Sequence, residues 1–365
     1  MRNRWRRGGS TADSLAVGVL GVGNIGAVHL QSVRAMPDVA VVAAADAAED
    51  NRAWAESMDV EETYADYTAL FEQASIDVAI IALPPFLHRD ALEQAAAHGI
   101  DVFVEKPLAR SVSEAAEMQS IAADANITVG VDHTLRYQQD IVAVKQAFES
   151  GRAAHVPYAS FVRINDASIG RPPIEEAPSW QLDPAAAGGG ALIELGIHCF
   201  DVLGWIFGPL EVEGACIERT LDLPVEDSAT VRLRAPETGT TIVCHCGTYQ
   251  WESLPDVNTR LHLEGVASTI DSAEYTPDSF YRSALWSALK NGVRRLIGRQ
   301  PLVYAPTYYL EAHYAALEAF LEASGREEPA PVGIPAAITA LELIEDAYES
   351  DQSQEAMVER PELAS

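Results

Sequence analysis

Short apolar runs alternate with amphipathic segments over the first third of the chain. The apolar runs, which predict buried strands, cover residues 15–20, 39–46, 76–83, 101–105 and 127–132. Helical periodicity predicts helices at residues 24–35, about 87–97 and 111–125. Continuous apolar strands separated by helices are typical of a parallel sheet that is covered on both faces. We therefore expect a doubly wound α/β domain over residues 14–133.

The pattern changes after Tyr137. Alternating apolar and polar positions predict longer strands at residues 158–164, 211–220, 228–235, 241–251, 259–265 and 267–271. Helices are predicted at residues 140–150, 308–324 and 334–350. These elements indicate a second, α+β domain over residues 134–350, built on a large open sheet that is mostly antiparallel. Residues 1–13 are expected to be a disordered extension and residues 351–365 a flexible tail.

The charge of the chain restricts its partners. The 365 residues carry a formal net charge of −29, and only three of the 25 basic residues are lysines. This balance argues against nucleic acid and anionic membranes as partners. The acidic residues are dispersed, as in proteins from salt-rich cytoplasms. If the protein is halophilic, its melting temperature should rise between low and molar KCl, and a fall would reject the hypothesis.

Neither a transmembrane helix nor an export signal is expected. We find no continuous run of about 18 apolar residues. The arginine-rich segment at residues 1–7 precedes an apolar run, but that run contains a glycine motif that cleavage would destroy. A cytoplasmic protein is the expectation.

The segment Cys244-His245-Cys246 invites a metal-site interpretation. It falls in a predicted strand, where residues two apart share a face and His245 points to the other. Two thiols make half a zinc site, and no second pair stands at a matching spacing. A structural role as small buried side chains is favoured.

The sequence GVGNIG follows the first predicted strand and opens a helix. Gly21 suits a tight turn, and Gly23 allows the backbone to approach a pyrophosphate closely. Gly26 allows the helix to pack closely on the strand. The amides at Asn24 and Ile25 would face the phosphates at the helix N-terminus. Asp46 lies 20 residues beyond Gly26 and would bind the ribose hydroxyls, which favours NAD over NADP. The alternative is a glycine-rich turn that binds nothing.

Glu105-Lys106-Pro107 ends the strand at residues 101–105. Ligands of doubly wound sheets bind at the carboxyl ends of the strands, so Lys106 is expected over that crevice. The proline restricts Lys106 to extended backbone conformations. The alternative is a surface lysine at a turn.

The segment GGGALIELGIHCFD places three polar side chains at helical spacing. Glu194, His198 and Asp201 are separated by four and three residues and so share one face, which Trp205 continues. Such a face can be the solvated side of a helix, a metal site or an acid/base pair. No convincing fourth ligand accompanies the three, so a metal is not favoured. Asp201 is interpreted as a supporting hydrogen-bond acceptor.

These motifs in this order resemble the Gfo/Idh/MocA family of NAD(P)-dependent oxidoreductases. The resemblance rests on GVLGVGNIG with Asp46, LPPFLHRDAL, VFVEKPLA, VGVDHTLRY, and the W-x-x-D-P segment before GGGALIELGIHCFD. It covers residues 14–350. It implies a Rossmann domain followed by an α/β domain whose open sheet forms a homodimer or homotetramer interface.

The resemblance also implies roles for individual residues. Lys106 matches the lysine that binds the nicotinamide ribose and the substrate hydroxyl, and His198 matches the acid/base. Glu194 stands where many members have aspartate. The residues expected along the cofactor are Leu83, Pro84, His88 and Glu105, and those expected at the substrate are His133, Arg136, Tyr137 and Trp180, besides Glu194 and His198.

Three function classes remain open at this point. The first is a dehydrogenase that acts on a sugar, cyclitol or sugar acid. The second is a redox-neutral sugar enzyme, such as a glycosidase or epimerase, that retains its NAD. The third is a non-catalytic NAD-binding regulator, which the presence of both Lys106 and His198 disfavours.

Overall fold

The computed structural model describes residues 14–166, 179–249, 258–276, 285, 288–290, 292–293, 296–297 and 308–351. The expected extension at residues 1–13 and the tail beyond residue 351 lie outside these ranges. The chain forms two compact units. Unit 1 comprises Met1–Ala109, Ser113–Gln138 and Pro277–Pro335, and unit 2 comprises Arg110–Val112, Gln139–Thr276 and Ala336–Ser365.

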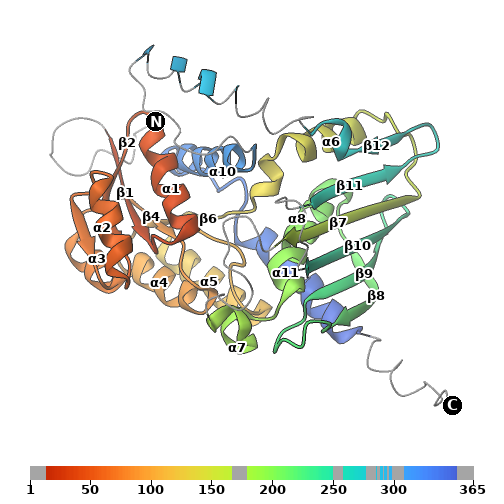
Figure 1. Cartoon of the computed structure of the whole chain (residues 1–365), viewed down its shortest axis with the longest axis horizontal. Helices are drawn as coiled ribbons and strands as arrows, with labels where there is room; N and C mark the ends of the chain where they lie inside the picture. Colours follow the sequence, from red (N-terminus) through yellow and green to blue (C-terminus); the bar gives the residue numbers. More distant parts are fainter. Residues whose placement is uncertain are drawn as a thin grey trace. The chain divides into compact units, whose positions relative to one another are not determined.

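Unit 1 contains a parallel six-stranded sheet (Figure 1). Its strands are β1 (Leu15–Leu20), β2 (Val39–Ala45), β3 (Glu62–Tyr64), β4 (Val78–Ile81), β5 (Asp101–Val104) and β6 (Val129–Val131). They lie in the order β3-β2-β1-β4-β5-β6, and every neighbouring pair is parallel. The order reverses between β1 and β4, where the ligand crevice of a doubly wound sheet opens. This arrangement confirms the predicted Rossmann fold.

The helices of unit 1 connect and cover these strands. They are α1 (Asn24–Ala35), α2 (Glu49–Ser57), α3 (Tyr67–Gln73), α4 (Pro85–Ala97), α5 (Val112–Ala125) and α10 (Tyr308–Gly325), with a 3₁₀ turn at Thr134–Tyr137. The hydrophobic pattern did not predict α2, β3 or α3. Of the nine residues of α2, only Ala55 is buried, so the apolar signal of this helix is almost absent.

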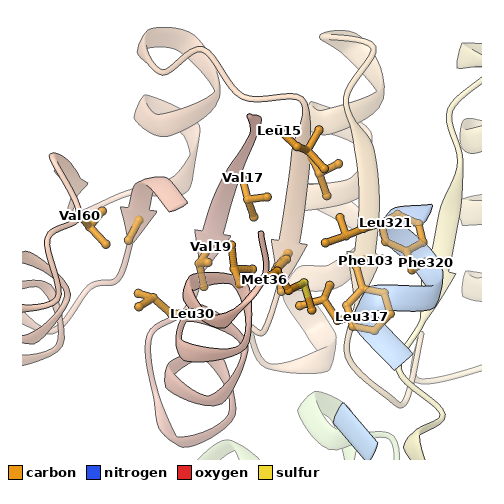
Figure 2. Packing of buried hydrophobic residues seen from close by; sticks show 14 of the residues in the cluster. Leu15, Val17, Val19, Leu30, Met36, Val60, Phe103, Leu317, Phe320 and Leu321 are labelled. Carbon is orange, nitrogen blue, oxygen red and sulfur yellow. The ribbon is translucent and has the colours of Figure 1, made fainter. Parts of the chain in front are cut away.

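An apolar cluster joins α1, the sheet and α10 (Figure 2). Leu30 of α1, Val17 and Val19 of β1, and Leu317 and Phe320 of α10 are all buried within it. The ring of Phe320 lies 5.3 Å from that of Phe103. We had expected α10 in the second domain, but its apolar face completes the core of unit 1 instead.

Unit 2 contains a second six-stranded sheet. Its strands are β7 (Tyr158–Asp166), β8 (Glu211–Glu218), β9 (Ser228–Ala235), β10 (Thr240–Tyr249), β11 (Asn258–Glu264) and β12 (Thr269–Asp271). The order is β12-β11-β7-β10-β9-β8, with β7 and β10 parallel and the other pairs antiparallel. The helices are α6 (Gln139–Glu149), α7 (Pro184–Ala187), α8 (Ile197–Phe207) and α11 (Ile334–Glu349). The predicted open, mostly antiparallel sheet is confirmed.

One segment of unit 2 is apolar enough to cross a membrane by length and composition alone. It spans Pro184–Phe207, with a mean hydropathy of 1.5 over its most apolar window, and 83% of that window is buried inside the protein. A core helix has the same composition and burial. The segment is also interrupted, because a π-helical turn at Leu192–Gly196 precedes α8.

The cysteines of β10 behave as the strand pattern predicts. Cys244 and Cys246 are buried and free. His245 lies between them on the other face, where its Nδ1 is 2.9 Å from the hydroxyl of Thr230. Hydrogen bonding to the buried Cys199 of α8, together with burial, raises the pKa of the Cys244 thiol. Cys244 is therefore an unreactive neutral thiol in the interior.

Candidate functional site

The glycine loop between β1 and α1 has the geometry that the motif predicts. Gly21 has a φ of +82°, and a Cβ on Gly26 would stand 1.8 Å from the carbonyl oxygen of Gly21. A Cβ on Gly23 would meet nothing within 4 Å. Gly23 is also the N-cap of α1 and offers no side-chain cap. The two outer glycines are required by the fold, whereas Gly23 leaves space beside the first amides of helix α1.

This contrast predicts different effects of two alanine substitutions. Gly26→Ala should lower the melting temperature, because no shift of a flexible side chain can relieve a clash with backbone. Gly23→Ala should leave the melting temperature unchanged but weaken NAD binding at least tenfold, because its methyl group occupies the space beside the amides. Thermal unfolding and fluorescence titration with NAD check both. Unchanged NAD binding in Gly23→Ala would reject this loop as the pyrophosphate site.

Asp46 joins the end of β2 to the glycine loop. Its carboxylate accepts hydrogen bonds from the amides of Val22 at 2.7 Å and Ala48 at 2.8 Å, and from the side-chain amide of Asn51 at 3.1 Å. The guanidinium of Arg52 donates to the carbonyl oxygens of Asp46 and Ala47. The contact of Arg52 was not predicted, because this residue lies six positions after Asp46 rather than next to it.

His88 ties the end of β4 to the turn after β5. Its Nε2 lies 2.7 Å from the carbonyl oxygen of Leu83, and its Nδ1 lies 3.1 Å from the carbonyl oxygens of both Pro107 and Leu108. Burial lowers the pKa of His88, although the hydrogen bonds to these carbonyls oppose the shift. The side chain is fully buried. His88 was predicted as a cofactor contact, but its geometry makes it a brace between two loops; Leu83 and Pro84 beside it are partly exposed.

Glu105 and Lys106 end β5 and differ in burial. The carboxylate of Glu105 contacts Nε2 of the buried His29 at 2.7 Å and accepts from the backbone amide of Lys106 at 3.2 Å. Lys106 itself is half-buried. Glu105, which we expected along the cofactor, is thus bonded to an interior side chain of α1, while Lys106 stands at the carboxyl edge of the sheet.

The segment after β6 carries three predicted substrate residues. His133 is buried, and Arg136 and Tyr137 are half-buried within the 3₁₀ turn. Tyr137 packs against the apolar cluster of unit 1. The buried Asp132 precedes them, and its Oδ2 lies 2.8 Å from Nδ1 of His313 in α10. Tyr137 is therefore at least partly a core residue.

In unit 2, the segment with Glu194 and His198 begins with a buried anchor. The carboxylate of Glu226 accepts hydrogen bonds from the amides of Gly190 at 2.8 Å and Leu192 at 3.1 Å, and from the hydroxyl of Tyr348 at 2.7 Å. A Cβ on Gly190 would stand 2.1 Å from the carbonyl oxygen of Glu226. The glycines therefore let the backbone approach this carboxylate, which holds the start of the helix.

The helix that follows starts with a π-helical turn, which the sequence did not predict. Glu194 lies in that turn and is half-buried, whereas His198 and Asp201 lie in α8 and are 5% and 4% exposed. The solvated-face interpretation is therefore wrong for His198 and Asp201. π-Helical turns are rare and frequently occur at functional sites.

The two tryptophans singled out from the sequence have separate settings. Trp205, at the end of the same face, has the ammonium of Lys145 at 4.9 Å from its ring centroid. Trp180 lies half-buried in a 3₁₀ turn at Ser179–Leu182. Among the described residues, Glu194, His198 and Asp201 do not form a cluster with metal-binding spacing.

Two family models match the chain, one in each unit. Residues 15–133 match the oxidoreductase family with an NAD-binding Rossmann fold, and residues 141–269 match the GFO/IDH/MocA C-terminal domain. The D-apiose dehydrogenase of Rhizobium rhizogenes is 29% identical over 58% of this chain and 59% of its own length. The inositol 2-dehydrogenase of Rhizobium meliloti is 27% identical over 87% of this chain and 91% of its own length. The chain spans little more than half the length of the first curated relatives that it matches.

Solved structures show the same fold. The oxidoreductase of Agrobacterium radiobacter in complex with NAD⁺, L-tartaric acid and magnesium superposes with a TM-score of 0.76 at 21% identity, over 93% of this chain and 97% of that one. The scyllo-inositol dehydrogenase of Lactobacillus casei with bound NAD(H) and scyllo-inositol superposes with a TM-score of 0.74 at 17% identity, over 93% and 98%. By its family matches and its fold, the chain belongs to the Gfo/Idh/MocA family of oxidoreductases.

Proposed function

We propose that this protein is an NAD-dependent oxidoreductase that interconverts a hydroxyl and a carbonyl group of a sugar, cyclitol or sugar acid. The observation that carries the proposal is the open space at Gly23, beside the N-terminus of α1. Lys106 stands at the carboxyl end of β5, on the edge of the sheet toward which the carboxyl end of β1 and the glycine loop also point.

The residues of this edge fit NAD. We assign the amides of Asn24 and Ile25 to the pyrophosphate and Asp46 to the ribose hydroxyls, with Leu83 and Pro84 beside the path of the cofactor. His88 and Glu105 are both buried, so we assign them to supporting the cofactor-binding edge of the sheet from the interior. When bound, NAD accepts or donates the two electrons that the change between alcohol and ketone requires.

The remaining chemistry belongs to side chains of both units. Lys106, from unit 1, stabilises negative charge on the reacting oxygen, and His198, from unit 2, takes or returns its proton. We propose that both side chains contact this same substrate oxygen. Glu194 binds a second hydroxyl of the substrate or orients His198, and Asp201 supports the helix. We place His133, Arg136, Tyr137 and Trp180 at the substrate by position in the family motif.

The relatives support the proposed substrate class. Their names include D-apiose dehydrogenase and inositol 2-dehydrogenase. Among the solved structures of the same fold, one holds scyllo-inositol and another levoglucosan. All of these are polyhydroxylated ring compounds. A panel of aldoses, cyclitols and sugar acids, assayed for NADH formation in low and molar KCl, tests the proposal; no activity on any member would count against it.

Asp46 should make the enzyme select NAD over NADP. A 2′-phosphate on the adenosine ribose would meet the Asp46 carboxylate, whereas free ribose hydroxyls would donate to it. Asp46→Asn should lower the ratio of kcat/KM for NAD to that for NADP by about tenfold or more, because one charge repulsion is worth more than ~1.4 kcal/mol at such a site. Asp66→Asn is the control. A ratio unchanged in Asp46→Asn would remove this residue from the cofactor site.

We also propose that the protein assembles as a homodimer or homotetramer through its second sheet. Alternate residues of β8 and β9 are exposed on one face of that sheet. Light scattering at two protein concentrations tests this, and a monomer at both would contradict it.

A further inference from the structure

Four titratable side chains from four separate elements meet inside unit 1. They are His29 of α1, Glu105 at the end of β5, Asp132 at the end of β6 and His313 of α10, and their nearest nitrogen and oxygen atoms all lie within 4.8 Å of one another. Nε2 of His29 lies 2.7 Å from Oε1 of Glu105 and 3.4 Å from Oδ2 of Asp132, and Nδ1 of His313 lies 2.8 Å from the same Oδ2. We call these four residues the buried network.

The buried network contains two carboxyl groups that contact each other. Burial and the charge of Glu105 raise the pKa of Asp132 well above its usual range. Burial alone would raise the pKa of Glu105 too, but its hydrogen bond to His29 and the charges of His29 and His313 hold that pKa below its usual range. Two carboxyl groups in contact in a low-dielectric interior cannot both stay ionised. One proton therefore remains on the pair, on the side of Asp132.

The contacts favour a proton over a metal ion as the shared cation. Ligands of a four-coordinate zinc, bound at ~2.0–2.1 Å, stand roughly 3.3 Å apart. The nitrogen–oxygen pairs at 2.7 and 2.8 Å are instead hydrogen bonds of ordinary length. A zinc-bound histidine also donates its other ring nitrogen to an acceptor, whereas Nδ1 of His29 has no hydrogen-bond partner in the part of the chain that the structure describes.

We propose that the buried network stores one proton on Asp132 and so leaves Glu105 as the ionised carboxyl group of the pair, next to the backbone of Lys106. Asp132 and His313 are then positioning residues. Glu105 accepts from the amide of Lys106, and the charge of Lys106 acts on Asp132. His88 of α4 also faces Glu105, and burial lowers the pKa of this histidine. The catalytic role of Lys106 rests on the proposed function, whereas the proton on Asp132 and the charge on Glu105 do not depend on it.

Competitive labelling of lysines measures this charge without any turnover. The chain has three lysines, Lys106, Lys145 and Lys290. The full-length protein is treated with trace acetic anhydride between pH 6 and 11, and the acetylation of each lysine is quantified by mass spectrometry. Lys145 and Lys290 report on global changes, so an effect confined to Lys106 is local.

Two isosteric substitutions should then behave differently. Glu105→Gln removes the negative charge of the ionised carboxyl group, so the acetylation rate of Lys106 near pH 8 should rise about threefold to tenfold, since a tenfold rise corresponds to one pKa unit. Asp132→Asn replaces a protonated carboxyl with an amide that donates and accepts in the same way, so the rate should change less than twofold. Equal rises in both variants would overturn the proposal, because Asp132 would then carry a charge in the native protein.

A second readout applies even if Glu105→Gln fails to fold. The infrared carbonyl stretch of a protonated carboxylic acid should be present in the wild type at pH 8 and absent in Asp132→Asn. Its absence from the wild type would overturn the proposal. So would one equivalent of zinc in the purified protein that is lost in Asp132→Asn. If labelling and infrared data agree with the proposal but no dehydrogenase activity is found, only the proposed function fails.

Discussion

Replacing Lys106 with alanine should lower kcat/KM by about 10²–10³. The half-buried ammonium at the end of β5 is the group that we place against the reacting oxygen, and removal of one preorganised donor to a developing oxyanion costs a factor of this size. The measurement is the initial rate of NADH formation with the best substrate of the panel.

Lys290→Ala is the matched control for this substitution. Lys290 is an exposed lysine paired with Glu311 at 2.9 Å, so its loss should leave kcat/KM within twofold of the wild type. A Lys106→Ala enzyme that kept more than a tenth of wild-type kcat/KM would show that Lys106 is not at the reacting oxygen.

Replacing His198 with alanine should lower kcat by about 10²–10⁴, the usual contribution of a general acid/base. The loss should be largest at neutral pH and smaller at high pH, where hydroxide and water replace the missing base. NAD affinity should hold, because His198 belongs to α8 of unit 2 and not to the glycine loop. Full pH profiles of kcat, with NAD binding measured separately, check this result.

The control here is His155→Ala, which removes an exposed imidazole of the same unit. It should change neither kcat nor the pH profile. Partial recovery of the His198→Ala variant by added imidazole would support proton transfer at this position. A variant that kept turnover within a few-fold of wild type and an unchanged pH profile would exclude His198 as the base.

Strongly patterned elements of the fold were predictable from the sequence, and weakly patterned ones were not. The first helix and strand were expected at the observed positions 24–35 and 15–20 because their apolar periodicity is clear. Helix α2 was missed because its exposed charged residues leave almost no buried stripe. The helix at residues 308–325 was predicted, but the elements against which it packs were not. An apolar stripe shows that a helix is buried, and only the structure shows that Phe320 packs on Phe103.

The candidate site shows the same limit. The glycine loop, Asp46 and Lys106 were found because local spacing and strand ends encode them. The anchor of Glu226 to Gly190 and the buried network were not found, because their members lie 36 and up to 284 residues apart, as for Gly190–Glu226 and His29–His313. The π-helical turn at Glu194 left no composition signal. This turn widens the helix at the position where this chain has glutamate instead of the shorter aspartate of many family members. A Glu194→Asp variant would therefore show what the longer side chain changes.

If the protein catalyses net oxidation of a carbinol carbon by NAD, deuterium must pass from that carbon to the cofactor. The substrate found in the panel is labelled with deuterium at the reacting carbon, and the released cofactor and product are analysed by mass spectrometry. We expect one deuterium in each released NADH for every ketone formed. Deuterium that returned to the product without net NADH would contradict it, because the protein would then be a redox-neutral enzyme that retains its NAD.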